Sequence, residues 1–261
     1  MSRYWRIYRS FFVSSFAREL EFRANFFAKV LQNVMWIFFF LMILLVIYRN
    51  TNSVAGWSRG QAFVLAATVF LMTSVAGALF MSLQEIPEHV RKGTLDFIIT
   101  KPIDTQFWIS TRKFNFDQVG TLLAGMVMVA VGVFLSGVTP GFVAWLSYLI
   151  LLLCSVVIFY SFNLALMTTG IWLVRVDNLW VLGESVQQVA RYPVEIFPRT
   201  VQWAFFYVMP LAFIATVPAS QLVKTPDPKM VLLGVAWAAA FFVLARLFWR
   251  FALRHYTSAS S

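Results

Sequence analysis

Apolar stretches long enough to cross a lipid bilayer recur along most of this chain. The clearest is VMWIFFFLMILLVI at 34–47, the centre of a span predicted at 30–48. A transmembrane helix needs about 20 mostly apolar residues, and further stretches of this kind lie at 61–83, 116–135, 142–173 and 230–249. Of 261 residues, 60% are hydrophobic and only 12% charged, too few polar groups to cover a soluble core of this size. The sequence predicts an all-α integral membrane protein that forms a single domain, 1–261.

The placement of basic residues predicts the topology. Most lie in the N-terminal segment, in the loop at 84–115 and at the C-terminal end: Arg3, Arg6, Arg9, Arg18, Arg23, Lys29, Arg91, Lys92, Lys101, Arg112, Lys113, Arg246, Arg250 and Arg254. The loops that face the other side carry few: Arg49, Arg59, Lys224 and Lys229. The positive-inside rule therefore places both termini and the 84–115 loop in the cytoplasm. Two cytoplasmic termini require an even number of crossings, and we expect six transmembrane helices.

The fifth crossing is predicted between 174 and 223. Segment 178–197 is apolar with a polar stripe, whereas 199–223 is apolar but interrupted by Pro210 and Pro218. Two full crossings here would place the basic C-terminus outside, so only one segment crosses. We assign the crossing to 178–197 and a re-entrant hairpin to 199–223, because irregular backbone at membrane depth must be covered by protein or line a cavity. The alternative, a surface helix at 178–198 and a span at 200–222, gives the same overall topology.

The N-terminal segment, 1–29, is predicted to be an amphipathic helix in the membrane interface. Its aromatic and apolar side chains recur at helical spacing on one face: Trp5, Tyr8, Phe12, Phe16 and Leu20. The arginines lie mainly on the other faces, where they can contact lipid phosphates. Because the basic residues lie between apolar stretches, the net charge of +10 indicates contacts with lipid headgroups and no binding of nucleic acid.

A second short amphipathic helix is predicted in the 84–115 loop, at 84–93. Pro87 suits a first helical turn and Gly93 suits the left-handed position after the last turn. The following LDFIIT stretch, 95–100, is expected to be extended. A helix with charges of both signs and an apolar stripe is suited to a cleft on a soluble partner. We therefore predict a docking element made of Glu85, Ile86, Glu88, His89, Val90, Arg91 and Lys92.

The polar stripe of the fifth span is the second candidate site. Its members fall at helical spacing: Glu184, Gln187, Gln188, Arg191 and Glu195. Ionisable side chains inside lipid are costly and face protein or water, and the three charged members are expected to pair along the helix. The stripe is interpreted as the lining of a transport path or of a dimer interface. A surface helix, or a stripe that only secures subunit packing, is the alternative.

Motifs of common enzyme sites are missing from the sequence. It contains no G-x-x-x-x-G-K-[ST] phosphate loop, no H-E-x-x-H and no G-x-S-x-G. Its only two histidines, His89 and His255, do not make a His-based metal site within one chain. We therefore expect that the chain is not an enzyme and binds no cofactor or metal itself.

Taken in order, these features resemble the ABC-2 type permeases, the membrane subunits of ATP-binding-cassette exporters. The resemblance rests on the basic N-terminus and on four motifs: I-x-x-x-x-RKGTLDFIITKPI at 86–103, RVDNLW at 175–180, RYPVEIFP at 191–198 and VMPLAFIATVPA at 208–219. It implies that 84–93 is the coupling helix that docks on an ATPase, that 1–29 is the connecting helix, and that 199–223 is the re-entrant hairpin.

The resemblance also implies partners and location. ATP and Mg would be bound by a separate ABC ATPase subunit in two copies, and a second permease chain, identical or homologous, would complete a complex in the bacterial inner membrane. The cargo is expected to be hydrophobic or amphipathic, since the aromatic-rich spans offer few polar groups. Two alternatives remain: an ATP-independent secondary transporter, for which no inverted repeat is evident, and a non-transporting scaffold subunit.

Overall fold

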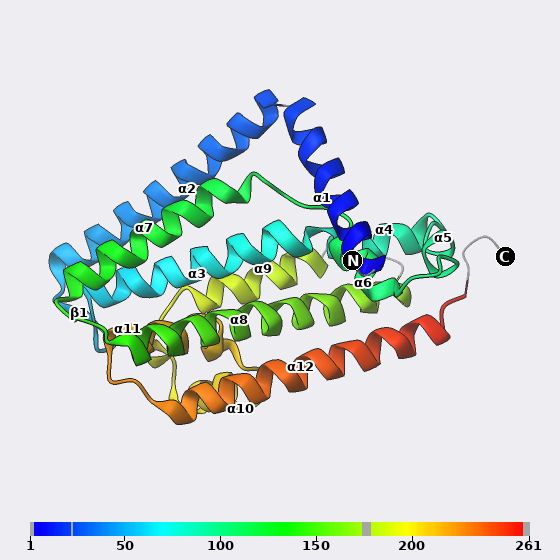
Figure 1. The fold of residues 1–261 in the computed structure, drawn as a ribbon. Coiled ribbons are helices and arrows are strands. Elements are labelled where there is room, and N and C mark those ends of the chain that lie inside the picture. Colours follow the sequence, from blue (N-terminus) through cyan, green and yellow to red (C-terminus); the bar gives the residue numbers. More distant parts are fainter. Residues whose placement is uncertain (1–2, 22, 174–178, 258–261) are drawn as a thin grey trace.

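The computed structural model describes residues 3–21, 23–173 and 179–257 as an assembly of helices (Figure 1). Within these residues, five helices are long and apolar enough to cross a membrane. They are α2 (Arg23–Asn50), α3 (Arg59–Phe80), α7 (Gln118–Ser136), α8 (Phe142–Thr168, extended by the 3-10 turn η2, Thr169–Ile171) and α12 (Pro228–Arg254). Each corresponds to one predicted span, which confirms an all-α, multi-pass membrane protein.

Helix α3 is the centre of the bundle. Helices α2 and α7 lie on one side of it, and α8 and α12 on the other (Figure 1). The apolar window of α3 is 67% buried, whereas that of α2 is only 11% buried. Close contact between α3 and α7 depends on Gly132, where an added Cβ would lie 2.8 Å from the backbone nitrogen of Val64. Small residues at such positions let two helix backbones approach closely.

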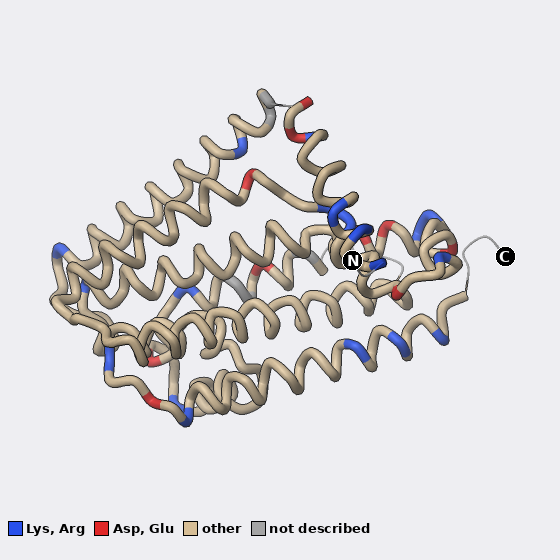
Figure 2. Tube along the Cα trace, in the orientation of Figure 1, with Lys and Arg blue, Asp and Glu red and all other residues tan. Residues whose placement is uncertain are grey.

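Shorter elements gather at the two ends of the bundle. At one end lie α1 (Arg3–Glu21), η1 (Met81–Glu85), α4 (Ile86–Arg91), α5 (Asp96–Ile99) and α6 (Thr105–Thr111), beside the last turns of α12. We call this the basic end, because Lys and Arg gather there and are sparse along the middle of the long helices (Figure 2). The opposite end carries a small hairpin of β1 (Ser53–Val54) and β2 (Trp57–Ser58).

The region of the fifth crossing differs from the prediction. Helix α9 (Leu179–Ala190) has 12 residues, so it is about 18 Å long and too short for a hydrocarbon core of about 30 Å. A turn follows, in which Pro193 ends the helical hydrogen bonding, and then the 3-10 turn η3 (Val194–Ile196). A single helix over 178–197 is therefore wrong within the described residues, which exclude 174–178.

The segment after α9 is also broken into short pieces. Helix α10 (Arg199–Tyr207), the turn η4 (Leu211–Phe213) and α11 (Thr216–Val223) replace a continuous span at 200–222. Pro210 lies between α10 and η4, where its missing N–H stops a regular helix. Helix α11 is nevertheless largely buried within the protein, which satisfies the requirement that irregular backbone be covered.

The N-terminal helix is shorter than predicted. Helix α1 ends at Glu21, and residues 23–29 belong to α2 instead of the interfacial helix. Figure 1 shows α1 folded back from α2 against the basic end. Its aromatic face packs on the segment before α7: the Phe12 ring centroid lies 5.0 Å from those of both Phe114 and Phe116. Trp5, at 51% exposure, stays on the surface.

Candidate functional site

The predicted helix at 84–93 forms as the turn η1 followed by α4. Pro87 lies in the first turn of α4, and Gly93 has the expected left-handed backbone, with φ of +66°. The extended conformation expected for 95–100 is wrong, because residues 96–99 form α5. One helical turn brings Leu95 and Ile98 to the same side, where both are buried. Burial of this pair against the bundle favours the helix.

The apolar stripe of α4 packs inside the protein. Leu83 and Ile86, with 1% and 0% exposure, belong to one buried cluster with Tyr160 of α8 and Trp249 of α12. Val90 packs against the same cluster. The stripe is therefore not free to enter a partner's cleft, and docking stays a prediction for the exposed residues of the helix. The stripe instead attaches the loop to the ends of two long helices.

Glu85 also has an internal role. Its carboxylate forms ion pairs with Arg112, at 2.6 Å, and with Lys113. These contacts join η1 to the segment between α6 and α7. His89 shares a hydrogen bond with Thr94 at 2.7 Å. Burial is the main cause that lowers the pKa of His89, and the nearby charge of Arg112 lowers it further. The imidazole is therefore neutral at pH 7. Glu85 is held by Arg112 and Lys113.

The remaining predicted docking residues point outward. Glu88 and Lys92 are exposed and form an ion pair at 2.6 Å, and hydrogen bonding to Lys92 lowers the pKa of Glu88. Two apolar side chains of α5 that were not in the predicted set are exposed as well, Phe97 by 71% and Ile99 by 38%. We call these residues the docking face: Glu88, Arg91, Lys92, Phe97 and Ile99.

A polar network fastens α6 to the long helices. Arg246 of α12 donates to Oδ1 of Asp104 at 2.9 Å and to Oε1 of Gln106 at 2.7 Å. Gln106 donates to the Tyr160 hydroxyl at 2.8 Å, and Ser110 lies 2.9 Å from that hydroxyl. The hydrogen bond from Arg246 is the main cause that lowers the pKa of Asp104. We call these five residues the clamp.

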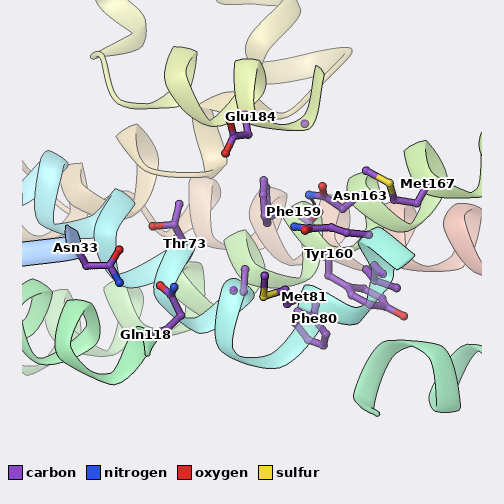
Figure 3. A pocket seen from close by; sticks show the side chains of 15 residues that line it. Asn33, Thr73, Phe80, Met81, Gln118, Phe159, Tyr160, Asn163, Met167 and Glu184 are labelled. Atoms are coloured by element: carbon purple, nitrogen blue, oxygen red, sulfur yellow. Dashed lines mark hydrogen bonds between the residues drawn. The ribbon is translucent and has the colours of Figure 1, made fainter. Parts of the chain in front are cut away.

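A cavity of about 280 Å³ lies between α2, α3, α7, α8 and α9. Figure 3 shows polar side chains from each of these helices around it, namely Asn33, Thr73, Gln118, Asn163 and Glu184. Phe80, Phe159 and the ring of Tyr160 form an aromatic wall. We call this space the polar cavity. Tyr160 belongs to both structures: its ring lines the polar cavity and its hydroxyl belongs to the clamp.

Several side chains around the polar cavity donate a hydrogen bond within the protein. Thr73 donates to the carbonyl of Val69 at 2.8 Å. Asn163 donates to the carbonyl of Phe159 at 2.9 Å, and Gln118 donates to Asp117 at 3.1 Å. Their oxygen atoms and the carboxylate of Glu184 are left to accept hydrogen bonds. The cavity is therefore rich in acceptors.

The predicted stripe of the fifth span is divided in the structure. Glu184 reaches the polar cavity, and Gln188 is exposed on the same helix; the side chain of Gln187 lies outside the described part. Arg191 follows the end of α9, and its guanidinium lies over the Trp36 ring, 5.6 Å from the centroid. Glu195 pairs with Lys224 at 3.2 Å. The expected pairing of Glu195 with Arg191 is wrong, because the chain turns between them.

Several residues of these sites were not singled out from the sequence. Asn33, Thr73, Asp104 and Arg246 each occur in or beside an apolar stretch. The available signal was the cost of a polar group inside lipid, which flags such positions but does not say which of them meet.

The five long apolar helices define a multi-pass membrane protein. A family model described as ABC-2 family transporter protein matches residues 34–260. The chain therefore belongs to the ABC-2 transporter family, as the resemblance of its motifs indicated. A search of curated proteins found no match.

Proposed function

We propose that this chain is the permease subunit of an ATP-driven exporter. In this proposal a separate ABC ATPase, in two copies, binds and hydrolyses ATP with Mg and docks on the basic end. The chain itself has no catalytic site and binds no cofactor. It moves a hydrophobic or amphipathic cargo out of the cytoplasm or the inner leaflet. Membership of the ABC-2 transporter family supports an ATPase partner in general.

One observation carries the proposal: the docking face is joined to the polar cavity by continuous contacts. Ile86 and Ile98, beneath the docking face, pack in the same cluster as Tyr160. Tyr160 is held by the clamp and lines the polar cavity. A displacement of α4 and α5 by an ATPase would therefore be transmitted to α8 and α12 by packed side chains, which resist compression.

The proposed topology places the basic end in the cytoplasm of a bacterium, with the chain in its inner membrane. Six crossings result if α9 and the segment after it together make the fifth. A second permease chain, identical or homologous, would cover part of α2 beside the membrane lipids. This is supported by the large exposed side chains of that helix, such as Phe38 at 57% and Ile43 at 60%.

The test is recovery of the ATPase with a tagged chain from native membranes. Mass spectrometry should identify an ABC ATPase, and its ATP hydrolysis should rise when the permease is present. The double variant Glu88→Lys/Phe97→Ala should lose most of the bound ATPase. The matched control Phe134→Ala, with a side chain 84% exposed on α7, should lose none. Glu85 is unsuitable for this test, because its substitution breaks internal ion pairs.

The outcomes separate this proposal from its alternatives. Recovery of no ATPase with the unmodified chain would overturn the proposal. Transport that stops with a proton ionophore while ATP is present would indicate a secondary transporter. An ATPase that binds but drives no movement of any cargo would indicate a scaffold subunit.

A further inference from the structure

The lining of the polar cavity defines the charge of a ligand that it would accept. Among its fifteen lining residues, Glu184 is the only Asp, Glu, Lys or Arg. Its carboxylate points from α9 toward the space beside Thr73 and Phe159 (Figure 3). Glu184 is an exposed residue that makes no hydrogen bond or ion pair within the described part of the chain, although its charge acts on Arg191. An acidic group in this position attracts a cation and repels an anion.

Two further features of the cavity favour an organic cation. The aromatic side chains of Phe80, Phe159 and Tyr160 line the cavity, and aromatic rings attract ammonium groups over their faces. The amide oxygens of Gln118 and Asn163 can accept hydrogen bonds, and one N–H of each amide is already bonded inside the protein. An ammonium group offers only donors. The cavity thus matches a donor-only, positively charged head.

The basic residues beside the cavity do not line it. Lys29 pairs with Asp117 at 3.4 Å, and Lys113 pairs with Glu85. The guanidinium of Arg191 lies over Trp36 in an adjoining cavity of about 110 Å³, where its Nε has no hydrogen-bond partner among the described residues. An anionic head would therefore find no free cation among the described lining residues of the polar cavity. This contrasts with a neighbouring cavity of about 250 Å³, which Lys29 and Lys113 do line.

The position of the cavity fits entry from a lipid leaflet. Gln118 is the first residue of α7, and Asn163 lies in the last two turns of α8, so the cavity is close to the basic end. At about 280 Å³ it is at the small end of ligand sites, large enough for a head group but not for a whole lipid. An alkyl chain would remain among the exposed apolar side chains of α2.

We propose that the polar cavity binds the head of a cationic amphiphile, an organic amine with an apolar tail, with Glu184 as its counter-ion. The proposal names the cargo class and so rests on the proposed function. The binding step is nevertheless independent of ATP and of any partner.

The experiment uses the full chain in lipid nanodiscs without an ATPase. Three probes share one twelve-carbon tail and differ in head charge: dodecylamine, dodecanol and dodecanoate. Equilibrium binding of each radiolabelled probe is measured at pH 7.4, where the amine is protonated. Dodecylamine should bind up to about fivefold more tightly than dodecanol, the size expected for one ion pair at an exposed carboxylate. Dodecanoate should bind most weakly.

Substitutions then locate the site. Glu184→Gln should remove the preference for dodecylamine over dodecanol, while the control Glu195→Gln, at the exposed pair with Lys224, should keep it. Gln118→Met, which removes the amide oxygen and keeps the length, should weaken dodecylamine about threefold. Size-exclusion profiles report folding of each variant.

Equal binding of amine and alcohol by the unmodified chain, or an unchanged preference in a folded Glu184→Gln variant, would overturn the proposal. Tightest binding of dodecanoate would do the same. These results would leave recovery of an ATPase unaffected. Conversely, amine binding without any recovered ATPase would support the site and reject the exporter.

Discussion

Loss of the clamp should loosen the loop at 84–115 without unfolding the bundle. The perturbations are Asp104→Asn, Arg246→Met and the two together. Asn is as good an N-cap as Asp, so Asp104→Asn should keep the hydrogen bond that starts α6, in which Phe107 N donates at 2.9 Å. Met keeps the aliphatic part of Arg246. The double-mutant cycle therefore isolates the ion pair from capping and packing.

The magnitude follows from the geometry of the pair. Hydrogen bonds to charged groups contribute about 1.5–3 kcal/mol each in favourable sites. The side chains of Arg246 and Asp104 are 24% and 31% exposed, so screening by water places the interaction at the lower end, about 1.5 kcal/mol. This corresponds to roughly a tenfold increase in the population of locally opened α6.

Hydrogen exchange measured by mass spectrometry in nanodiscs reports this opening directly. Peptides that cover 104–113 should exchange about tenfold faster in each single variant. The double variant should exchange hardly faster than Arg246→Met, because the single substitution already breaks the ion pair. Arg246→Met also removes the hydrogen bond to Gln106. Peptides from α3, at the centre of the bundle, should not change. Fully additive single effects, or unchanged exchange in 104–113, would refute the role of the ion pair.

The sign of the pH dependence is a further check. The pKa of Asp104 is below its usual value of 3.8 in the folded protein. Its contribution is therefore complete above pH 3.8 and is lost as the pH falls through the folded pKa. After correction for intrinsic exchange rates, protection of α6 should not vary between pH 6 and 8.

The remaining predictions concern the loop and the bundle. The pKa of His89 is below 6.5 in the folded protein. Its contribution to stability is therefore complete above pH 6.5 and is lost as the pH falls toward the folded pKa. Hydrogen exchange in 86–94 should accelerate between pH 6.5 and 5, and a His89→Gln variant should show a smaller acceleration. Gly132→Val should lower the free energy of unfolding by about 1–3 kcal/mol, through overpacking. Gly141→Ala should lower it less, because the position has open space around it and only the N-cap of α8 is weakened. Equal melting temperatures of the two variants would contradict this. Glu85→Lys should expose the loop to limited proteolysis, because three basic groups would then meet; unchanged cleavage would show that the ion pairs are dispensable.

Short-range features of this protein were readable from the sequence. The five long helices follow from apolar stretches, because the thickness of a bilayer sets the length of an apolar helix. Pro87 and Gly93 identified the turns at either end of α4, since each acts through its own backbone. The breaks at Pro193 and Pro210 have the same origin, although the sequence alone suggested a longer fifth span.

The α5 helix shows where local reasoning fails. The mostly apolar LDFIIT stretch ends in β-branched residues, which favour an extended conformation. The bundle instead offers a buried site to Leu95 and Ile98, and one helical turn fills that site with both. The exposed Phe97 follows from this choice, so the most exposed part of the docking face was not visible from the sequence.

The sequence by itself determined that this chain lies in a membrane, where its long helices are, and to which family it belongs. Only the tertiary structure decided the partners of the polar residues. Glu85 is bound by residues 27 and 28 positions away, and Arg246 by residues 142 and 140 positions away. Likewise, five helices contribute to the polar cavity. Spacing along one helix shows which residues share a face, but a polar group in a low-dielectric bundle pairs with whatever the packing of apolar side chains brings within reach.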